Sequence, residues 1–230
     1  MQKSLFRSTT LVSGMTFMSR VLGLVRDVLI AQIFGATAAI DAFYVAFRIP
    51  NFMRALFAEG AFSQAFVPVL SEYRELKTPE ELRQFVARMQ GALLLSLVLL
   101  VTFCIIFAPT IAVLFAPGFA DEPYRLSLTI EMLRITFPYL LLISMAAFCG
   151  SVLNSHGSFG PPAFAPVLLN AIMIIAALWL SPHFSEPVVA LAVGVFIAGI
   201  CQFLFQIPFL HVKQLFILPK LVWKDPGVRR

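Results

Sequence analysis

The stretch from residue 17 to residue 60 constrains the fold most, because charged side chains interrupt two apolar helices there. Its hydropathy predicts two membrane-spanning helices joined at Gly35–Thr37. The stretch holds the arginines Arg20, Arg26, Arg48 and Arg54 and the acids Asp27, Asp41 and Glu59. One arginine at a helix centre costs about 2.5–3.5 kcal/mol, so four cost about 10–14 kcal/mol. These side chains must therefore face other helices, a watery cavity or a charged ligand, since lipid cannot accommodate them.

The composition places the chain in a membrane. Of its 230 residues, 60% are hydrophobic and 13% are charged, whereas a soluble domain carries about 25% charged residues. The net charge of +5 does not predict a nucleic-acid partner, because basic residues of membrane proteins gather on the cytoplasmic side. The three cysteines lie in apolar runs without metal-ligand spacing, so neither a metal site nor a disulfide framework is indicated.

We predict an all-α fold, a polytopic membrane bundle of six transmembrane helices that forms a single domain, 1–230. A bilayer core of about 30 Å needs about 20 apolar residues in a helix. The sequence lacks the ten-residue alternating segments of a closed barrel. Pro109 is expected to be absorbed near the end of the third helix. The expected spans are about 8–34, 40–70, 85–115, 127–153, 163–181 and 187–210.

Basic residues outside these spans, or near their ends as Arg88 is, predict the orientation. Eleven lysines and arginines fall on one side of the membrane, whereas the other side has Arg125 alone. By the positive-inside rule, both ends of the segment are cytoplasmic. The loop 71–84 is then cytoplasmic as well. Within it, Thr78 is expected to cap a short amphipathic helix, with Glu81 at the capping-box position.

The charged side chains allow two interpretations. In the first, they neutralise one another inside the bundle as structural ties. Arg48 and Asp41 are seven residues apart and share a helix face, so Arg48 is expected to pair with Asp41. Structural pairing is also the expected role of Asp27 and Glu59.

In the second interpretation, Arg20, Arg26 and Arg54 form an anion site near the middle of the membrane. Too few acids accompany them to neutralise all three. Arginine binds phosphate through two parallel hydrogen bonds and is weakly hydrated for a cation, which suits a diphosphate in a partly dry cavity. Asn154 and Asn170 are expected to make hydrogen bonds between helices.

Five segments of the sequence are distinctive: SRVLGLVRD (Ser19–Asp27), the long run Asp41–Tyr73, APGF (Ala116–Phe119), FPYL (Phe137–Leu140) and PAFAPVLLN (Pro162–Asn170). Together they closely resemble the MurJ (MviN) family, and the resemblance covers the whole chain. That family flips lipid II, the undecaprenyl-diphosphate-linked peptidoglycan precursor, across the bacterial inner membrane.

The resemblance implies a fold and a cellular role. The family belongs to the multidrug/oligosaccharidyl-lipid/polysaccharide exporter superfamily, whose members have two six-helix lobes facing each other across a central cavity. This chain is then the N-terminal lobe, a fragment whose partner is the missing C-terminal lobe. The implied role is to move lipid II from the cytoplasmic to the periplasmic leaflet by alternating access, for cell-wall synthesis. Membrane lipids are the other expected partners.

The resemblance also assigns residues. The expected diphosphate-binding residues, which match family arginines required for flipping, are Arg20, Arg26 and Arg54. The expected supporting residues of the cavity are Ser19, Asp41, Arg48 and Glu59, of which Asp41 matches an important acid of the family. No catalytic residue, metal ligand or cofactor is expected. Coupling to a monovalent cation or to the membrane potential stays open, because the sodium site described for some family members falls beyond Arg230. A further required arginine of the family, at the start of the second lobe, also falls beyond Arg230.

The alternative functions are two other transporters, a membrane enzyme and a scaffold. A flippase for another polyprenyl-linked oligosaccharide and an ion-coupled multidrug antiporter share the superfamily. An antiporter for cations should line its cavity with acids and aromatics, whereas arginine is in excess here. A membrane enzyme acting on polyprenyl diphosphates needs an acid-rich metal motif or a nucleophile with its base, and the sequence has neither. A non-transporting scaffold has little reason to bury four arginines.

Overall fold

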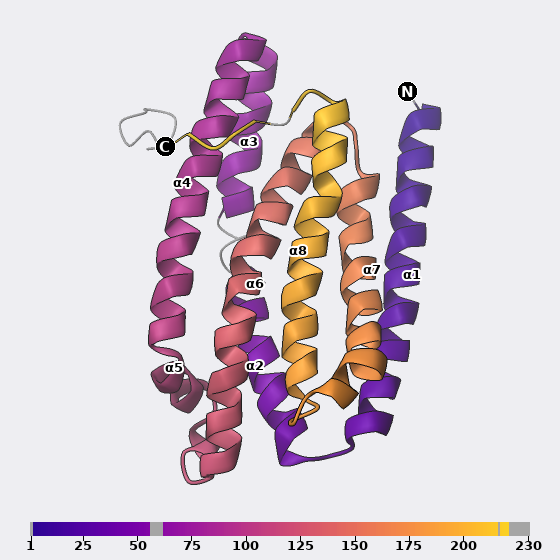
Figure 1. Cartoon of the computed structure of the whole chain (residues 1–230). Coiled ribbons are helices and arrows are strands. Elements are labelled where there is room, and N and C mark those ends of the chain that lie inside the picture. The colour runs from indigo at the N-terminus through magenta and orange to yellow at the C-terminus, as the bar shows by residue number, and fades with distance from the viewer. Residues whose placement is uncertain (1, 56–61, 216, 221–230) are drawn as a thin grey trace.

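The computed structural model describes residues 2–55, 62–215 and 217–220. In this part of the chain the regular structure is helical, without a strand. Short helical turns lie at one end of the bundle: the 3-10 turns η2 (Pro117–Phe119) and η4 (Ser181–His183) and the π-helical turn η3 (Ala176–Leu180). The α-helices in Figure 1 are α1 (Gln2–Phe34), α2 (Ala38–Arg54), α3 (Phe62–Leu76), α4 (Pro79–Ile106), α5 (Ala108–Phe115), α6 (Pro123–Ser155), α7 (Gly160–Ile175) and α8 (Val189–Val212).

Four helical segments of the described residues are long and apolar enough to cross a membrane. They are Pro79–Ile106, Pro123–Ser155, Gly160–His183 and Val189–Val212. The prediction of an all-α membrane bundle is thus confirmed, and the expected number of six transmembrane helices is matched for four. The two N-terminal spans are not among them. Helix α1 carries Arg20, Arg26 and Asp27 in its apolar half, and the second span is described as two helices of 17 and 15 residues.

The expected span 40–70 is described as two helices, α2 and α3, and residues 56–61 between them lie outside the described part. The expected span 85–115 is wrong as a single helix. It stops at Ile106 and restarts as α5 at Ala108, so Pro109 is not absorbed. A proline has no N–H to donate and its ring clashes with the carbonyl four residues earlier, whereas the first turn of a new helix needs no donor. Pro109 accordingly lies in the first turn of α5.

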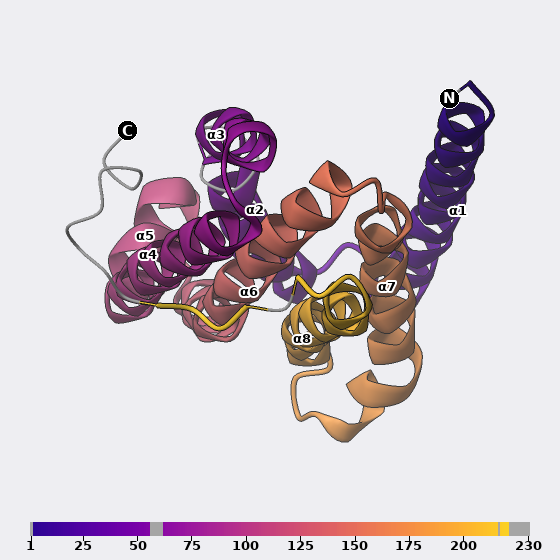
Figure 2. The ribbon, with the colours of Figure 1, turned by 90° about the horizontal axis from the view of Figure 1, so that it is seen from above.

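Helix α6 is the centre of the bundle, since it packs against α2, α3, α4, α5, α7 and α8. Seen from above, the helices follow an arc from α3 and α4 on one side, past α6 and α8, to α7 and α1 on the other (Figure 2). Helix α1 packs mainly against α7. Its exposed face carries large apolar side chains, with Phe17 70% exposed and Leu24 67% exposed, and Arg20 lies between them on the same face. That face suits lipid or a further protein surface.

The two ends of the bundle differ. The start of α1, the α3–α4 connection and the end of α8 lie at the same end (Figure 1). At that end Thr78 caps α4: its side chain accepts from the backbone N–H of Glu81, and the Glu81 carboxylate accepts from the backbone N–H of Thr78 at 2.9 Å. The predicted capping box is confirmed, but the prediction that it caps a short amphipathic helix is wrong, because α4 continues without a break from Pro79 to Ile106 over 28 residues.

Candidate functional site

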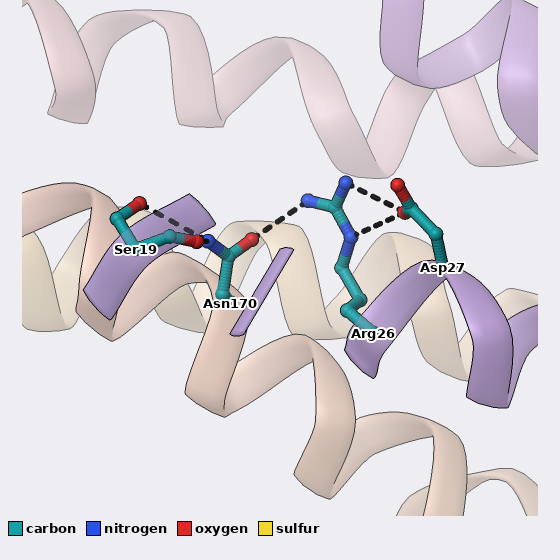
Figure 3. A network of polar contacts seen from close by, with 4 residues as sticks. All are labelled: Ser19, Arg26, Asp27 and Asn170. Carbon is teal, nitrogen blue, oxygen red and sulfur yellow. Dashed lines mark hydrogen bonds and ion pairs between the residues drawn. The ribbon is translucent and has the colours of Figure 1, made fainter. Parts of the chain in front are cut away.

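A polar network joins α1 to α7 within the charged stretch (Figure 3). The Arg26 guanidinium donates to Asp27 Oδ1 through Nε at 2.9 Å and through Nη2 at 2.7 Å. Its Nη1 donates to Asn170 Oδ1 at 2.9 Å. Asn170 in turn donates from Nδ2 to the Ser19 carbonyl oxygen at 2.8 Å and to the Ser19 hydroxyl at 3.3 Å. The amide of one α7 residue therefore ties together two turns of α1.

This network leaves part of Arg26 available. Arginine has five N–H donors, and three of them are used by Asp27 and Asn170. The Arg26 side chain is 19% exposed and that of Asp27 is 58% exposed. The ion pair is therefore open to solvent on one side, where an anion could reach the remaining donors of Arg26 or compete with the Asp27 carboxylate.

The structural prediction for Asp27 is confirmed, since it pairs with Arg26. Asn170, predicted to hydrogen-bond between helices, does so. Ser19, predicted as a supporting residue, belongs to the same network. Arg20 lies next to it and is exposed on α1. Glu59 lies outside the described residues, so its expected role is not described.

The second polar site surrounds Arg54 on α2. Arg54 lines a pocket of about 310 Å³ between α2, α6, α7 and α8. Most of its other polar lining is neutral and comes from three helices. These residues are Asn51 on α2, Ser151 and Asn154 on α6, and Gln202 and Gln206 on α8. The structure thus places Arg26 in one polar site and Arg54 in another, with α7 contributing to both through Asn170 and the residues 162–169.

Asp41 has a different partner from the predicted one. Its Oδ2 is 3.5 Å from Nη2 of Arg125 in the first turn of α6, and Arg125 also contacts Glu122 at 3.1 Å. The prediction that Arg48 pairs with Asp41 is therefore wrong within the described residues, and Arg48 is exposed on α2. Packing of α2 on α6 explains the change, because it brings the two helix starts together. Asp41 therefore pairs with a residue of a neighbouring helix and not with Arg48, two turns along its own helix.

Sequence reasoning missed the glutamines of the Arg54 pocket. Gln202 is 2% exposed and Gln206 is 1% exposed, although both lie in an apolar transmembrane helix. A signal for them exists: Gln202 and Gln206 are four residues apart, as Asn51 and Arg54 are three apart, so each pair shares a helix face. Paired polar residues inside an apolar helix indicate a polar wall.

The fold defines a class first, a bundle of membrane-spanning helices that superposes on about half of a larger chain. Some 97% of the chain superposes on 49% of a solved MATE protein in complex with MaD3S, with a TM-score of 0.72 and 20% sequence identity. At that identity the likeness shows the fold alone.

The particular family follows from closer relatives. A family model described as lipid II flippase MurJ matches residues 30–230, and the chain belongs to this family. A probable lipid II flippase MurJ of Haemophilus influenzae is 48% identical over 225 residues, which cover 94% of this chain and 44% of the relative. A solved lipid II flippase MurJ in an inward closed conformation matches with a TM-score of 0.76 and 32% identity, over 96% of this chain and 44% of that one. The chain therefore spans less than half the length of the relatives it matches.

Proposed function

We propose that residues 1–230 form one half of a flippase for lipid II, which moves this lipid from the cytoplasmic to the periplasmic leaflet by alternating access. The observation that carries the proposal is the 48% identity to a protein named as a probable lipid II flippase. The arginine-bearing faces of α1 and α2 agree with it, because the cargo of such a protein is anionic. The bacterial inner membrane is the corresponding location.

The proposed half consists of six membrane passes. Four correspond to the long apolar segments, and α1 and the pair α2 and α3 supply the other two. In Figure 1, α2 lies in the lower part of the bundle and α3 in the upper part, so that together they run along its height. The C-terminal half of the protein would face the arginines across a central cavity.

The proposed orientation has both ends of this segment in the cytoplasm, as the charge count predicts. Single cysteines tested with an impermeant thiol reagent on intact cells measure it. A cysteine replacing Glu186, beside the η4 turn, should react, whereas one replacing Ser71, near the end of α3, should be shielded. The reverse labelling pattern would overturn the orientation.

The proposed diphosphate ligands are Arg20, Arg26 and Arg54. Arg26 has two N–H groups left after its bonds to Asp27 and Asn170, Arg54 faces the neutral polar pocket, and Arg20 is exposed. A diphosphate carries enough acceptor oxygens for several such donors. In this proposal Ser19, Asp41 and Arg48 are supporting residues.

The test is lipid II binding by the purified full-length protein. Replacing any of the three arginines by alanine should weaken binding by about 1.5–3 kcal/mol, the worth of a hydrogen bond to a charged group. Lysine should restore only part of this, because it keeps the charge but loses the planar fork. Arg48→Ala is the internal control: as a supporting residue, its loss should lower the abundance of the protein in the membrane more than it lowers binding per folded molecule.

Two results would contradict the assignment. One is normal lipid II binding in all three alanine variants. The other is a loss of the variants from the membrane in step with the loss of binding, which would mark the arginines as structural. Rescue of flippase-depleted cells by the full-length protein, and its failure with the Arg26→Ala variant, would extend the result from binding to transport.

A further inference from the structure

The neutral wall of the Arg54 pocket has hydrogen-bonding capacity that the protein does not use. Gln202 donates from Nε2 to the Ala165 carbonyl oxygen at 2.7 Å. This bond fixes the orientation of the amide, because a carbonyl accepts only from the nitrogen side. The Gln202 Oε1 atom is left buried and without a hydrogen-bond partner in the described part of the chain.

Gln206, one helical turn further along α8, is in the same condition. It is 1% exposed, and its Oε1 atom has no hydrogen-bond partner among the described residues. It lies against Gly150 of α6: a Cβ atom built there would be 3.5 Å from Gln206 Oε1 and 3.1 Å from Pro162. Glycine at this position thus leaves room for Pro162 of α7, and the Gln206 amide lies beside it at the wall of the pocket. A buried carbonyl without a donor costs free energy. A ligand that brings N–H or O–H groups to these two carbonyl oxygens would therefore be favoured.

The charges of the pocket exclude some occupants. Arg54 is part of the lining, and no aspartate or glutamate is among the described lining residues. A cation, whether a metal ion or a cationic drug, would be repelled by the guanidinium, and the described lining residues supply no carboxylate to offset its loss of water. Neutral or anionic groups remain. The side-chain amides and the Ser151 hydroxyl both donate and accept, which suits a neutral group rich in hydroxyls and amides.

The size of the pocket further limits which ligand it can hold. The volume of about 310 Å³ lies at the small end of the range of about 300–1,000 Å³ for ligand pockets. This volume matches one ring with its substituents, so a larger headgroup would extend out of the pocket. Because Arg54 belongs to the same lining, we expect the ring to be joined to an anionic group that the guanidinium can bind.

We propose that this pocket is a sugar subsite, which holds the sugar directly attached to a polyprenyl diphosphate while the phosphates contact Arg54. Gln206 and Gln202 accept from its hydroxyl or amide hydrogens, and Asn154 and Ser151 complete the wall. The inference rests on the proposed function and deepens it, because it assigns the neutral part of the cargo to residues outside the arginine set.

The experiment compares two probes on the purified full-length protein: undecaprenyl diphosphate, which has no sugar, and undecaprenyl diphosphate carrying one N-acetylated hexose. The measured quantity is the ratio of their dissociation constants. The unmodified protein should bind the sugar-bearing lipid more tightly. Gln206→Leu keeps the bulk but removes the amide, so it should weaken binding of the sugar-bearing lipid about 3- to 10-fold, the worth of a neutral hydrogen bond, and leave the bare diphosphate lipid unchanged.

A second variant tests the pocket without removing a polar group. Ala147→Leu adds bulk to the lining and should abolish the preference for the sugar-bearing lipid, so it decides the matter if Gln206→Leu fails to accumulate in the membrane. Gln90→Leu, on α4 and outside this lining, is the control and should preserve the ratio. Arg54→Ala should weaken binding of both lipids by the same factor.

The outcomes separate the inference from the proposed function. An unchanged ratio in both pocket variants would overturn the sugar subsite and mean that the pocket holds only water. An equal loss for both lipids would also overturn it, because the pocket would then act on the diphosphate. Equal affinity of the unmodified protein for the two lipids would overturn the sugar subsite but not the proposed function. If the unmodified protein bound neither lipid, both the proposed function and the sugar subsite would be overturned.

Discussion

Replacing Asn170 by alanine should loosen α1 from the rest of the bundle. Asn170 is 6% exposed and makes two short hydrogen bonds to α1, at 2.9 Å from Arg26 and 2.8 Å to the Ser19 carbonyl, besides the longer contact to the Ser19 hydroxyl. In water the bond to a charged group alone would contribute about 1.5–3 kcal/mol. Between transmembrane helices, measured values average about 0.6 kcal/mol and reach about 1.7, because the unfolded chain in the membrane also finds partners.

The values measured between transmembrane helices are the ones to use for the cost of Asn170→Ala. Two such bonds amount to about 1–3 kcal/mol of the free energy of unfolding. The part that belongs to the Arg26–Asn170 contact is isolated by a double-mutant cycle with Arg26→Ala and Asn170→Ala. The cycle cancels the separate loss of the Arg26–Asp27 pair. We expect a coupling free energy of about 0.6–1.7 kcal/mol, measured by reversible unfolding of the purified full-length protein in mixed micelles.

The control cycle combines Arg26→Ala with Thr136→Val. Thr136 on α6 donates to the Ala46 carbonyl of α2 at 2.9 Å, which is also a bond between helices but has no part in the α1–α7 network. The two changes should be additive within about 0.3–0.5 kcal/mol. A coupling between Arg26 and Asn170 no larger than in this control would refute the reasoning.

Four further changes test the packing, the charges and a helix cap. Gly199→Val should destabilise the protein by about 1–3 kcal/mol in thermal unfolding, because a Cβ there would lie 2.7 Å from a tyrosine ring of α6, whereas Gly14→Ala, with nothing within 4 Å, should stabilise α1 by about 0.5–1 kcal/mol. Arg125→Ala, which removes the partly exposed pair with Asp41, should cost less than about 1 kcal/mol in the same assay, and the cost should shrink at high salt. Thr78→Ala should cost about 1 kcal/mol through loss of the helix cap, visible as faster amide exchange in the first turn of α4.

The features that follow from local physical chemistry were predictable from the sequence. Hydropathy identified the long apolar helices, and the spacing of Thr78 and Glu81 identified the capping box. Asn170 was expected to bond between helices, because an amide in an apolar segment needs a partner. Each of these predictions uses only residues near one another in the chain, or a burial cost that any fold must meet.

Features that depend on the neighbouring helix were not predictable in the same way. The partner of Asp41 is Arg125, because α2 packs on α6 and brings their first turns together. The helix break before Pro109 was underestimated, although other prolines, such as Pro138 of α6, lie inside continuous helices. Proline permits a break without requiring one, and the surrounding packing decides. The diphosphate role of the arginines is still a prediction.

On the proposed function, the two polar sites suit a cargo that must be both bound and released. At Arg26 the guanidinium is already paired with Asp27, so a phosphate that takes its place gains only the difference between two ion pairs, and the carboxylate stands ready to displace it. In the Arg54 pocket the glutamine carbonyls are neutral, and each hydrogen bond exchanged with water changes the free energy by only about 0.5–1.5 kcal/mol. Three arginines without competing acids would bind a diphosphate too tightly for rapid release. An arginine that already pairs with a carboxylate, next to a pocket with neutral amides, recognises the diphosphate and its sugar and still allows release.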